Sequence, residues 1–421
     1  MSALDRRMPR RLVWLGASLV GVSLSIVAAL TALTALVLSA VGVVKPDMTG
    51  IMMLSGLIAI GLGLGIPLTF HGWAGWRAQP SRPFTTSRHW RVLLIWIIFV
   101  VGGVALSRVS PALRRWLLIP FHTGAMVTPS LAILWWVNST LRGERCSHRE
   151  VTAGLAGGGI VGTAAALLAE GVAILVLIVV VAVIISIIPG GTDSVMNLVN
   201  RLEDPTLLSD SAELAGLLLS PWVIVSVLGF VTIPVPLLEE AIKTLTMGVF
   251  GVWLRPTPAR GFLWGVASGA GFALSENLLN GSIGGETGWG MVALARGAAT
   301  VMHCATGGLV GWGWTQLWTT RRHPLRFLSA YGLAVLFHAL WNAAAVGSAL
   351  LELAAEANRG TGPSVWLMSM SARALWAVLA LMAGTLLTAV LQAGRKLGSQ
   401  RQAHGTEGEN DAPTPACGLQ V

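Results

Sequence analysis

The stretch Pro234-Val-Pro-Leu-Leu-Glu-Glu-Ala-Ile-Lys243 places two adjacent carboxylates and an ammonium group inside an otherwise apolar segment. A charged side chain at the centre of a bilayer costs roughly 2.5–3.5 kcal/mol on insertion scales. Such groups persist in membrane helices mainly where they face the protein interior or a water-filled cavity. The stretch therefore predicts a helix inside a membrane protein, kinked at its prolines, and it marks a functional site.

The composition of the whole chain agrees with a membrane protein. Of its 421 residues 54% are hydrophobic and 11% are charged, whereas a soluble domain carries about 25% charged residues. The apolar runs are long enough for helices, since barrel strands would be about ten residues long. We predict an all-α, polytopic helical integral membrane protein with about ten transmembrane helices, at 12–39, 48–70, 92–107, 117–138, 152–188 (with a Gly-rich interfacial lead-in), 214–254, 261–280, 290–318, 327–350 and 366–392.

The net charge of +9 lies in short segments between the apolar runs, where it indicates topology rather than nucleic-acid binding. With a cytoplasmic N-terminus, the predicted inner segments hold most of the Lys and Arg residues, as the positive-inside rule requires. We therefore expect both termini in the cytoplasm and the protein in a bacterial-type plasma membrane. The basic residues 1–11 before an over-long apolar run predict an uncleaved signal anchor. The three cysteines show no spacing typical of a disulfide framework or a thiolate metal site.

Four successive predicted helices carry polar residues that are unusual at membrane depth. They are Glu239, Glu240 and Lys243 on the first, Glu276 and Asn277 on the second, Arg296 and His303 on the third, and His338 and Asn342 on the fourth. At about 1.5 Å rise per residue, one group on each helix lies roughly 22 Å from the cytoplasmic end. The small residues Gly269, Gly271, Gly307 and Gly308 would let these helices pack closely. We expect the polar groups to converge at one depth, in the outer half of the bilayer.

This combination of side chains suits hydrolysis. A carboxylate can act as base toward water, and a His with an amide can stabilise an oxyanion. It also suits a metal, because two His with a Glu form a catalytic zinc set, and the candidate ligands are His303, His338 and Glu276. No His-Glu-x-x-His is present, so the spacing does not establish zinc. Glu170 has no polar neighbour in sequence, and we expect it to be an interfacial residue outside the site.

The motifs Glu-Glu-x-x-Lys, Gly-x-Gly-Phe-Ala-x-x-Glu-Asn, Arg-x6-His and His-x-x-Trp-Asn follow one another between Pro234 and Asn342. In this order they resemble the PrsW family of intramembrane proteases, which is similar to the CAAX prenyl endopeptidases and the bacterial Abi-type membrane proteases. The resemblance implies an endopeptidase that cuts a membrane-anchored protein, in the best-known members an anti-sigma factor. By motif, Glu239 and Glu240 would supply the water-activating carboxylate. The catalytic candidates are Glu239, Glu240, Glu276, His303, His338 and Asn342, with Lys243, Asn277 and Arg296 in support.

The sequence does not decide whether the protein uses a metal cofactor. The family is commonly labelled a metalloprotease family, but its prenyl-endopeptidase relatives look like glutamate-dependent enzymes without a metal. A metal-free glutamate mechanism is the preferred expectation, and zinc is the alternative. The expected partners are a membrane-anchored protein substrate and the lipid bilayer, not nucleic acid.

The chain divides into five predicted parts. They are a cytoplasmic segment (1–11), an N-terminal transmembrane region of unknown role (12–213), a protease core (214–350), the last helix with its outer loop (351–392) and a disordered cytoplasmic tail (393–421). The alternative function is a proton-coupled transporter or channel that uses the Glu and His residues as a relay. A relay would spread polar groups along a path across the membrane, whereas these groups are predicted to gather at one level. A catalytically inactive scaffold that binds a partner is a third possibility.

Overall fold

The computed structural model describes residues 3–42, 47–85, 89–106, 109, 111–141, 146–188, 193, 196–197, 199–200, 211–282, 288–318, 323–358 and 363–410. Within these ranges the chain forms helices and no strand, apart from a single bridge between Pro83 and Ser147. The predicted all-α class is confirmed. The sequence also predicts an acidic extracytoplasmic loop from Gly190 to Glu213, of which only residues 193, 196–197, 199–200 and 211–213 are described.

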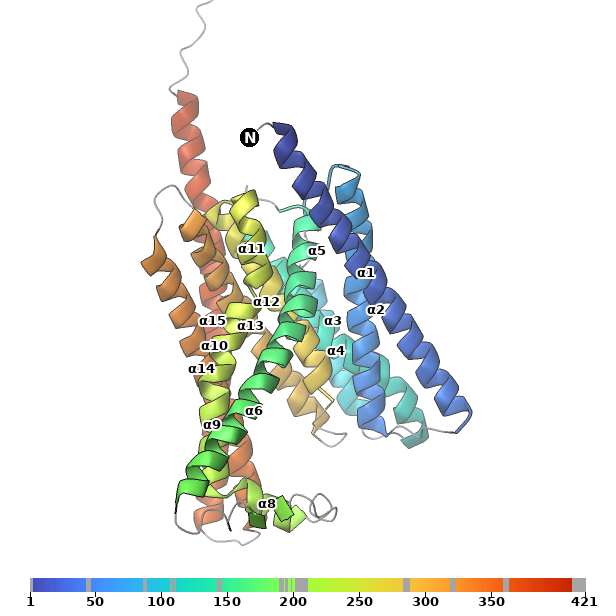
Figure 1. The fold of residues 1–421 in the computed structure, drawn as a ribbon, viewed down its shortest axis with the longest axis vertical. Helices are drawn as coiled ribbons and strands as arrows, with labels where there is room; N and C mark the ends of the chain where they lie inside the picture. The colour runs from blue at the N-terminus through green and yellow to red at the C-terminus, as the bar shows by residue number, and fades with distance from the viewer. Residues whose placement is uncertain are drawn as a thin grey trace, which may run out of the picture.

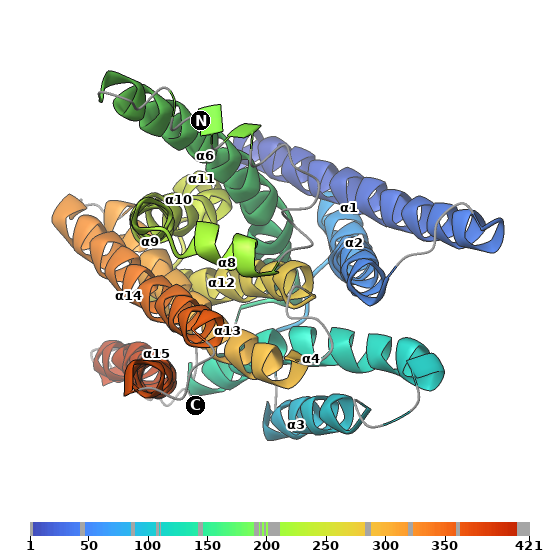
Figure 2. The same ribbon diagram turned by 90° about the horizontal axis from the view of Figure 1, so that it is seen from below.

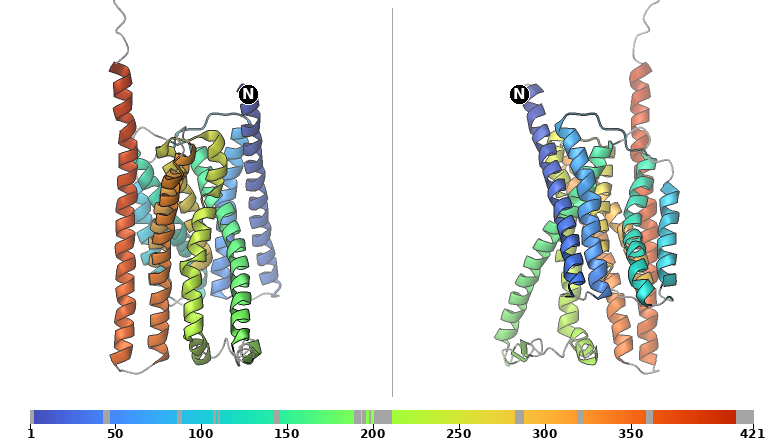
Figure 3. Two further views of the ribbon diagram at one scale, coloured as in Figure 1. Left: turned by 60° about the vertical axis from the view of Figure 1, so that its left-hand side comes forward. Right: turned by 90° about the vertical axis from the view of Figure 1, so that its right-hand side faces the viewer.

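The helices run side by side along the long axis of the molecule (Figure 3). In chain order they are α1 (Ala3–Ala40), α2 (Met48–Trp76), α3 (His89–Leu106), α4 (Pro111–Thr140), α5 (His148–Ala156), the π-helix η1 (Gly157–Gly162), α6 (Thr163–Ile187), α8 (Ser211–Leu218), α9 (Pro221–Thr232), α10 (Pro234–Ile242), α11 (Leu245–Leu254), α12 (Pro258–Asn280), α13 (Trp289–Trp318), α14 (Pro324–Ala357) and α15 (Pro363–Asn410).

Within the described part of the chain, seven stretches are long and apolar enough to cross a membrane. They are Arg11–Ala40, Met48–Trp76, Leu117–Thr140, His148–Ile187, Pro221–Leu254, Pro324–Ala357 and Pro363–Ser399. The protein is therefore a polytopic helical membrane protein. The helices α3, α12 and α13 lie in the same bundle (Figure 1) but are shorter or more polar, so the count of ten spans stays a prediction.

Helix α12 occupies the centre of the bundle, where α2, α4, α5, η1 and α13 pack around it (Figure 2). Every residue from Ala259 to Leu278 is buried except Arg260 and Glu276. Its contact with α13 depends on glycine, because a Cβ added at Gly269 would lie 2.1 Å from the carbonyl oxygen of His303. The predicted close packing at this glycine is confirmed, and it brings the backbone of α13 next to α12.

The predicted break near Pro234 is also confirmed. Helix α9 ends at Thr232 and α10 begins at Pro234, with Ile233 between them at φ −115° and ψ −74°. Proline is tolerated at a first helical position because its missing N–H would have no intrahelical partner there. A second interruption at Lys243 and Thr244 separates α10 from α11. The two carboxylates of the opening stretch therefore lie on a short helix of nine residues.

The Gly-rich segment before α6 is not the interfacial lead-in that its sequence predicts. It continues α5 into α6 as the π-helix η1, whose glycines 157, 158, 159 and 162 are all buried. A Cβ added at Gly158 would lie 1.9 Å from the carbonyl oxygen of Ser268, so only glycine permits this approach to α12. The close packing of η1 places the first turns of α6 beside α10.

The C-terminal end differs from the predicted disordered tail at 393–421. Helix α15 continues to Asn410 and projects beyond the other helices (Figure 3). Its residues after 392 include Gln, Arg, Lys, Ala and Glu, which favour a helix and extend one that is already nucleated. Residues 411–421 lie outside the described ranges.

Candidate active site

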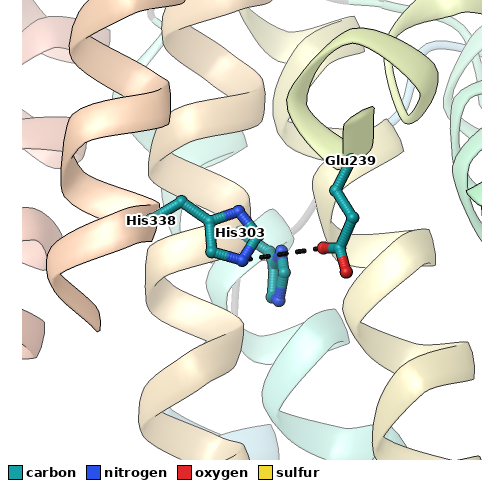
Figure 4. A group of neighbouring side chains, drawn as sticks. All are labelled: Glu239, His303 and His338. Carbon is teal, nitrogen blue, oxygen red and sulfur yellow. Dashed lines mark ion pairs between the residues drawn. The ribbon is translucent and has the colours of Figure 1, made fainter. Parts of the chain in front are cut away.

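Three buried side chains from three helices meet in the bundle: Glu239 of α10, His303 of α13 and His338 of α14 (Figure 4). Each offers one potential ligand atom, and these atoms all lie within 4.8 Å of one another. The Nε2 atom of His338 is 3.6 Å from Oε2 of Glu239. The two imidazole rings are 5.1 Å apart and nearly perpendicular, at 85°. This trio is the centre of the candidate site.

The ring of His338 is hydrogen bonded to Glu240 through Nδ1, the nitrogen that does not face Glu239. Its Nδ1 atom is 2.8 Å from Oε1 of Glu240, an oxygen that also pairs with the ammonium group of Lys243 and lies 3.1 Å from the hydroxyl oxygen of Thr306. The Lys243 ammonium group also donates to the Thr306 hydroxyl at 2.8 Å. Because Glu240 is an ion-paired acceptor, Nδ1 carries the hydrogen in this bond, and the lone pair of Nε2 faces Glu239.

The ring of His303 lies against Glu276, which also contacts Arg296. Its Nε2 atom is 2.8 Å from Oε2 of Glu276, and Nη2 of Arg296 is 2.9 Å from the same oxygen. The Nε of Arg296 donates to Oδ1 of Asn277 at 2.8 Å, and the Asn277 amide donates to the carbonyl of Met126 at 3.2 Å. The Nδ1 atom of His303 is buried and has no hydrogen-bond partner. His303 therefore also has one unoccupied ring nitrogen.

With Glu239 ionised and both rings neutral, the trio consists of electron-pair donors alone. Two ring nitrogens without hydrogen and a carboxylate oxygen would be costly to bury together unless a proton donor or a cation lies among them. Ligands at about 2.1 Å from a tetrahedral zinc ion are about 3.4 Å apart, close to the 3.6 Å between Nε2 of His338 and Oε2 of Glu239. Carboxylates behind metal-bound histidines are also typical of metal sites. These residues fit a divalent metal ion such as zinc.

Most of the residues that the sequence predicts for the site lie together in the structure. Glu239, Glu240, Lys243, Glu276, Asn277, Arg296, His303 and His338 form one connected cluster. The candidate metal ligands in the sequence were His303, His338 and Glu276, whereas the atoms that lie close enough together to share an ion belong to His303, His338 and Glu239. The amide of Asn342 donates to the carbonyl of Val231 at 2.9 Å, which ties α14 to α9 just before the break.

Two residues of the cluster were missed by sequence reasoning. Thr306, which contacts Glu240 and Lys243, has no signal beyond its position one helical turn after His303. Glu170, expected to be interfacial, is half-buried on α6, which packs against α10, and it is close enough to Glu239 to interact with it electrostatically. The signal for Glu170 was a single carboxylate in a long apolar run, which is costly in a membrane without a partner.

The comparison with known families agrees with the motifs. Residues 147–375, just over half of the chain, match the model described as PrsW family intramembrane metalloprotease. This range contains every residue of the cluster, including Glu170, and begins well before the motifs at 234–342. No curated protein and no solved structure matches the chain.

Proposed function

The chain belongs to the PrsW family of intramembrane metalloproteases, and from this premise we propose that the trio Glu239, His303 and His338 hydrolyses a peptide bond of a membrane-anchored protein. The observation that carries the proposal is the convergence of three buried electron-pair donors from three helices. A peptidase active site needs such a group to activate water and polarise a carbonyl. The family resemblance favours a regulator of the anti-sigma-factor kind as the substrate.

The trio also favours a metal over the metal-free alternative. Oxyanion stabilisation by neutral histidines needs N–H groups that point at the reacting oxygen, but one ring nitrogen of His338 is hydrogen bonded to Glu240 and one of His303 is in contact with Glu276. Glu239, His303 and His338 would hold the ion. When bound there, it would polarise the carbonyl of the scissile bond and lower the pKa of a bound water.

Glu239 and Glu240 take different roles in this proposal. Oε1 of Glu240 is already occupied by His338, Lys243 and Thr306, so Glu240 positions His338. Glu239 faces the histidines, and its Oε2 has no hydrogen-bond partner. The carboxylate oxygen of Glu239 that would not hold the ion accepts the proton of the water as the water oxygen bonds to the carbonyl carbon. It then returns this proton to the amine nitrogen as the carbon–nitrogen bond breaks.

The substrate can be sought in whole membranes. Cells with the wild-type protein and cells with Glu239→Gln are compared by proteomics of their membrane fraction. We expect at least one membrane-anchored protein to be truncated in the wild-type cells and intact in the variant cells, because only the variant lacks the carboxylate that accepts the proton. Complementation with the wild-type gene should restore the truncated form. Identical sets of truncated proteins in both strains would contradict the proposed protease function.

A further inference from the structure

A groove between α13, α14 and α15 takes no part in the proposed reaction. Its volume is about 590 Å³, which lies within the range of roughly 300–1,000 Å³ that is usual for ligand sites in proteins. Helix α12 adds Pro258 and Phe262 to its lining. Leu333 of α14 and Ala389 of α15 line the groove and are exposed. The groove is therefore open on the side of the bundle, where a membrane lipid can reach it.

Three helices each present one face to the groove. The lining positions recur three, four or seven residues apart, as one face of a helix requires. They are 305, 309, 312 and 316 on α13, 326, 333 and 337 on α14, and 386, 390, 393 and 397 on α15. On every helix the last position is eleven residues after the first, so the groove follows the helices for roughly 16 Å. This shape suits an extended chain.

The groove exists because α15, at the edge of the bundle (Figure 2), packs against two different neighbours. Near its start, the indole of Trp376 donates to Glu352 of α14 at 3.0 Å. Further along, a Cβ added at Gly394 would lie 2.1 Å from the hydroxyl oxygen of Thr140 on α4. Residues 386–397 are thus held to α4 by one face, and another face of the same segment lines the groove.

The strongly polar lining residues lie at one end of the groove. Nη1 of Arg326 donates to Oε1 of Gln316 at 3.4 Å, and Lys396 lines the same end from α15. Apart from Thr306 at the opposite end, the other lining residues carry aliphatic or aromatic side chains, and none of the described lining residues is acidic. The positive-inside rule places the end with Arg326 and Lys396 at the cytoplasmic face. The groove therefore combines an apolar trough with a cationic mouth.

We propose that this groove binds an anionic phospholipid of the cytoplasmic leaflet, with an acyl chain along the apolar part and the phosphate between Arg326 and Lys396. Basic pockets between membrane helices on the cytoplasmic side bind anionic head groups in this way. Among the described residues no acidic side chain pairs with either cation. An apolar helix would fill the trough but leave both cations without an anion. The inference does not depend on the proposed protease function, because Glu239, His303 and His338 do not line the groove.

Two lipids with the same chains and different head-group charge test the inference. The delipidated full-length protein in detergent is titrated with dioleoyl phosphatidylglycerol or with dioleoyl phosphatidylcholine, and bound lipid is counted by native mass spectrometry. Each basic residue near a membrane surface contributes a factor of roughly five toward an anionic lipid. We expect the wild type to bind the anionic lipid roughly 25-fold more tightly than the neutral one. Arg326→Gln and Lys396→Gln should each lower the affinity for the anionic lipid roughly five-fold and leave the neutral lipid unaffected.

The matched control for the charge is Arg395→Gln, which removes a cation next to Lys396 from a side chain that does not line the groove. It should bind both lipids like the wild type. The acyl-chain site is tested by Ala389→Phe, which fills the groove and should abolish the tight site for both lipids. Its control is Ala380→Phe, the same change at an exposed position of α15 outside the groove. Unfolding temperatures show that each variant is folded.

Three results would overturn the inference. A wild-type protein without preference between the two lipids would leave an apolar helix as the candidate occupant of the groove. Equal losses in Lys396→Gln and Arg395→Gln would show a general attraction of anionic lipid to the basic surface. Unchanged lipid binding in Ala389→Phe would place the lipid outside the groove.

Discussion

Glu239→Gln is expected to lower the rate of substrate cleavage by roughly 10²- to 10⁴-fold, the usual contribution of a positioned general base. Glutamine keeps the shape of the side chain but cannot accept the proton of the attacking water. The side chain is buried and its Oε2 has no hydrogen-bond partner, so the substitution keeps the packing but removes both the base and the carboxylate that would hold the metal ion. The measurement is the single-turnover rate of cleavage in reconstituted membranes, with the substrate identified by the proteomic comparison.

The control for this prediction is Glu352→Gln, which makes the same chemical change on α14 away from the cluster. It should cleave at the wild-type rate. A cleavage rate in Glu239→Gln that equals the wild-type rate would show that another group activates the water. In that case Glu240 would be the next candidate, despite its three partners on Oε1.

Lys243→Met is expected to destabilise the folded protein by about 3–5 kcal/mol, the typical cost of leaving one member of a buried ion pair without its partner. The side chains of Lys243 and Glu240 are both fully buried, and their charged groups are in direct contact. Without the ammonium group, the negative charge of Glu240 remains among apolar helices with only His338 and Thr306 as partners. The measurement is the free energy of unfolding in detergent micelles, or the shift of the unfolding temperature.

The double variant Lys243→Met, Glu240→Gln separates the charge effect from a packing effect. Removing both charges should restore part of the lost stability, because no uncompensated charge is then buried. If the single variant is as stable as the wild type, the ion pair does not have the structural role assigned to it. If the double variant is no more stable than the single one, the loss comes from packing.

Much of this fold is predictable from local sequence. Long apolar runs predicted the helices, and the break was predicted at Pro234, because proline removes a donor and clashes with the preceding turn. The convergence of four polar helices was predicted from the cost of charges in a membrane. That prediction needed only the distance of each group from the end of its helix, and the structure brings Glu239, Glu276, His303 and His338 into one cluster.

The details that sequence reasoning missed depend on helix rotation and on contacts between distant segments. Whether Glu239 or Glu276 joins the histidines is decided by how the short helix α10 turns after the break at Ile233, which no local pattern encodes. The amide of Asn342 shares a helical face with His338, yet it binds the carbonyl of Val231. Glu170 is 69 residues before Glu239, and only the π-helix η1 brings its helix to the site.

Glu239, His303 and His338 are proposed to form one metal-dependent catalytic centre. The most direct test is to measure the zinc content and the cleavage rate of the same purified samples, for the wild type and for His303→Ala and His338→Ala. We expect one zinc ion per wild-type chain, loss of zinc and of cleavage in both variants, and loss of wild-type cleavage after chelation. A wild-type protein that is free of metal, insensitive to chelators and fully active would contradict this proposal.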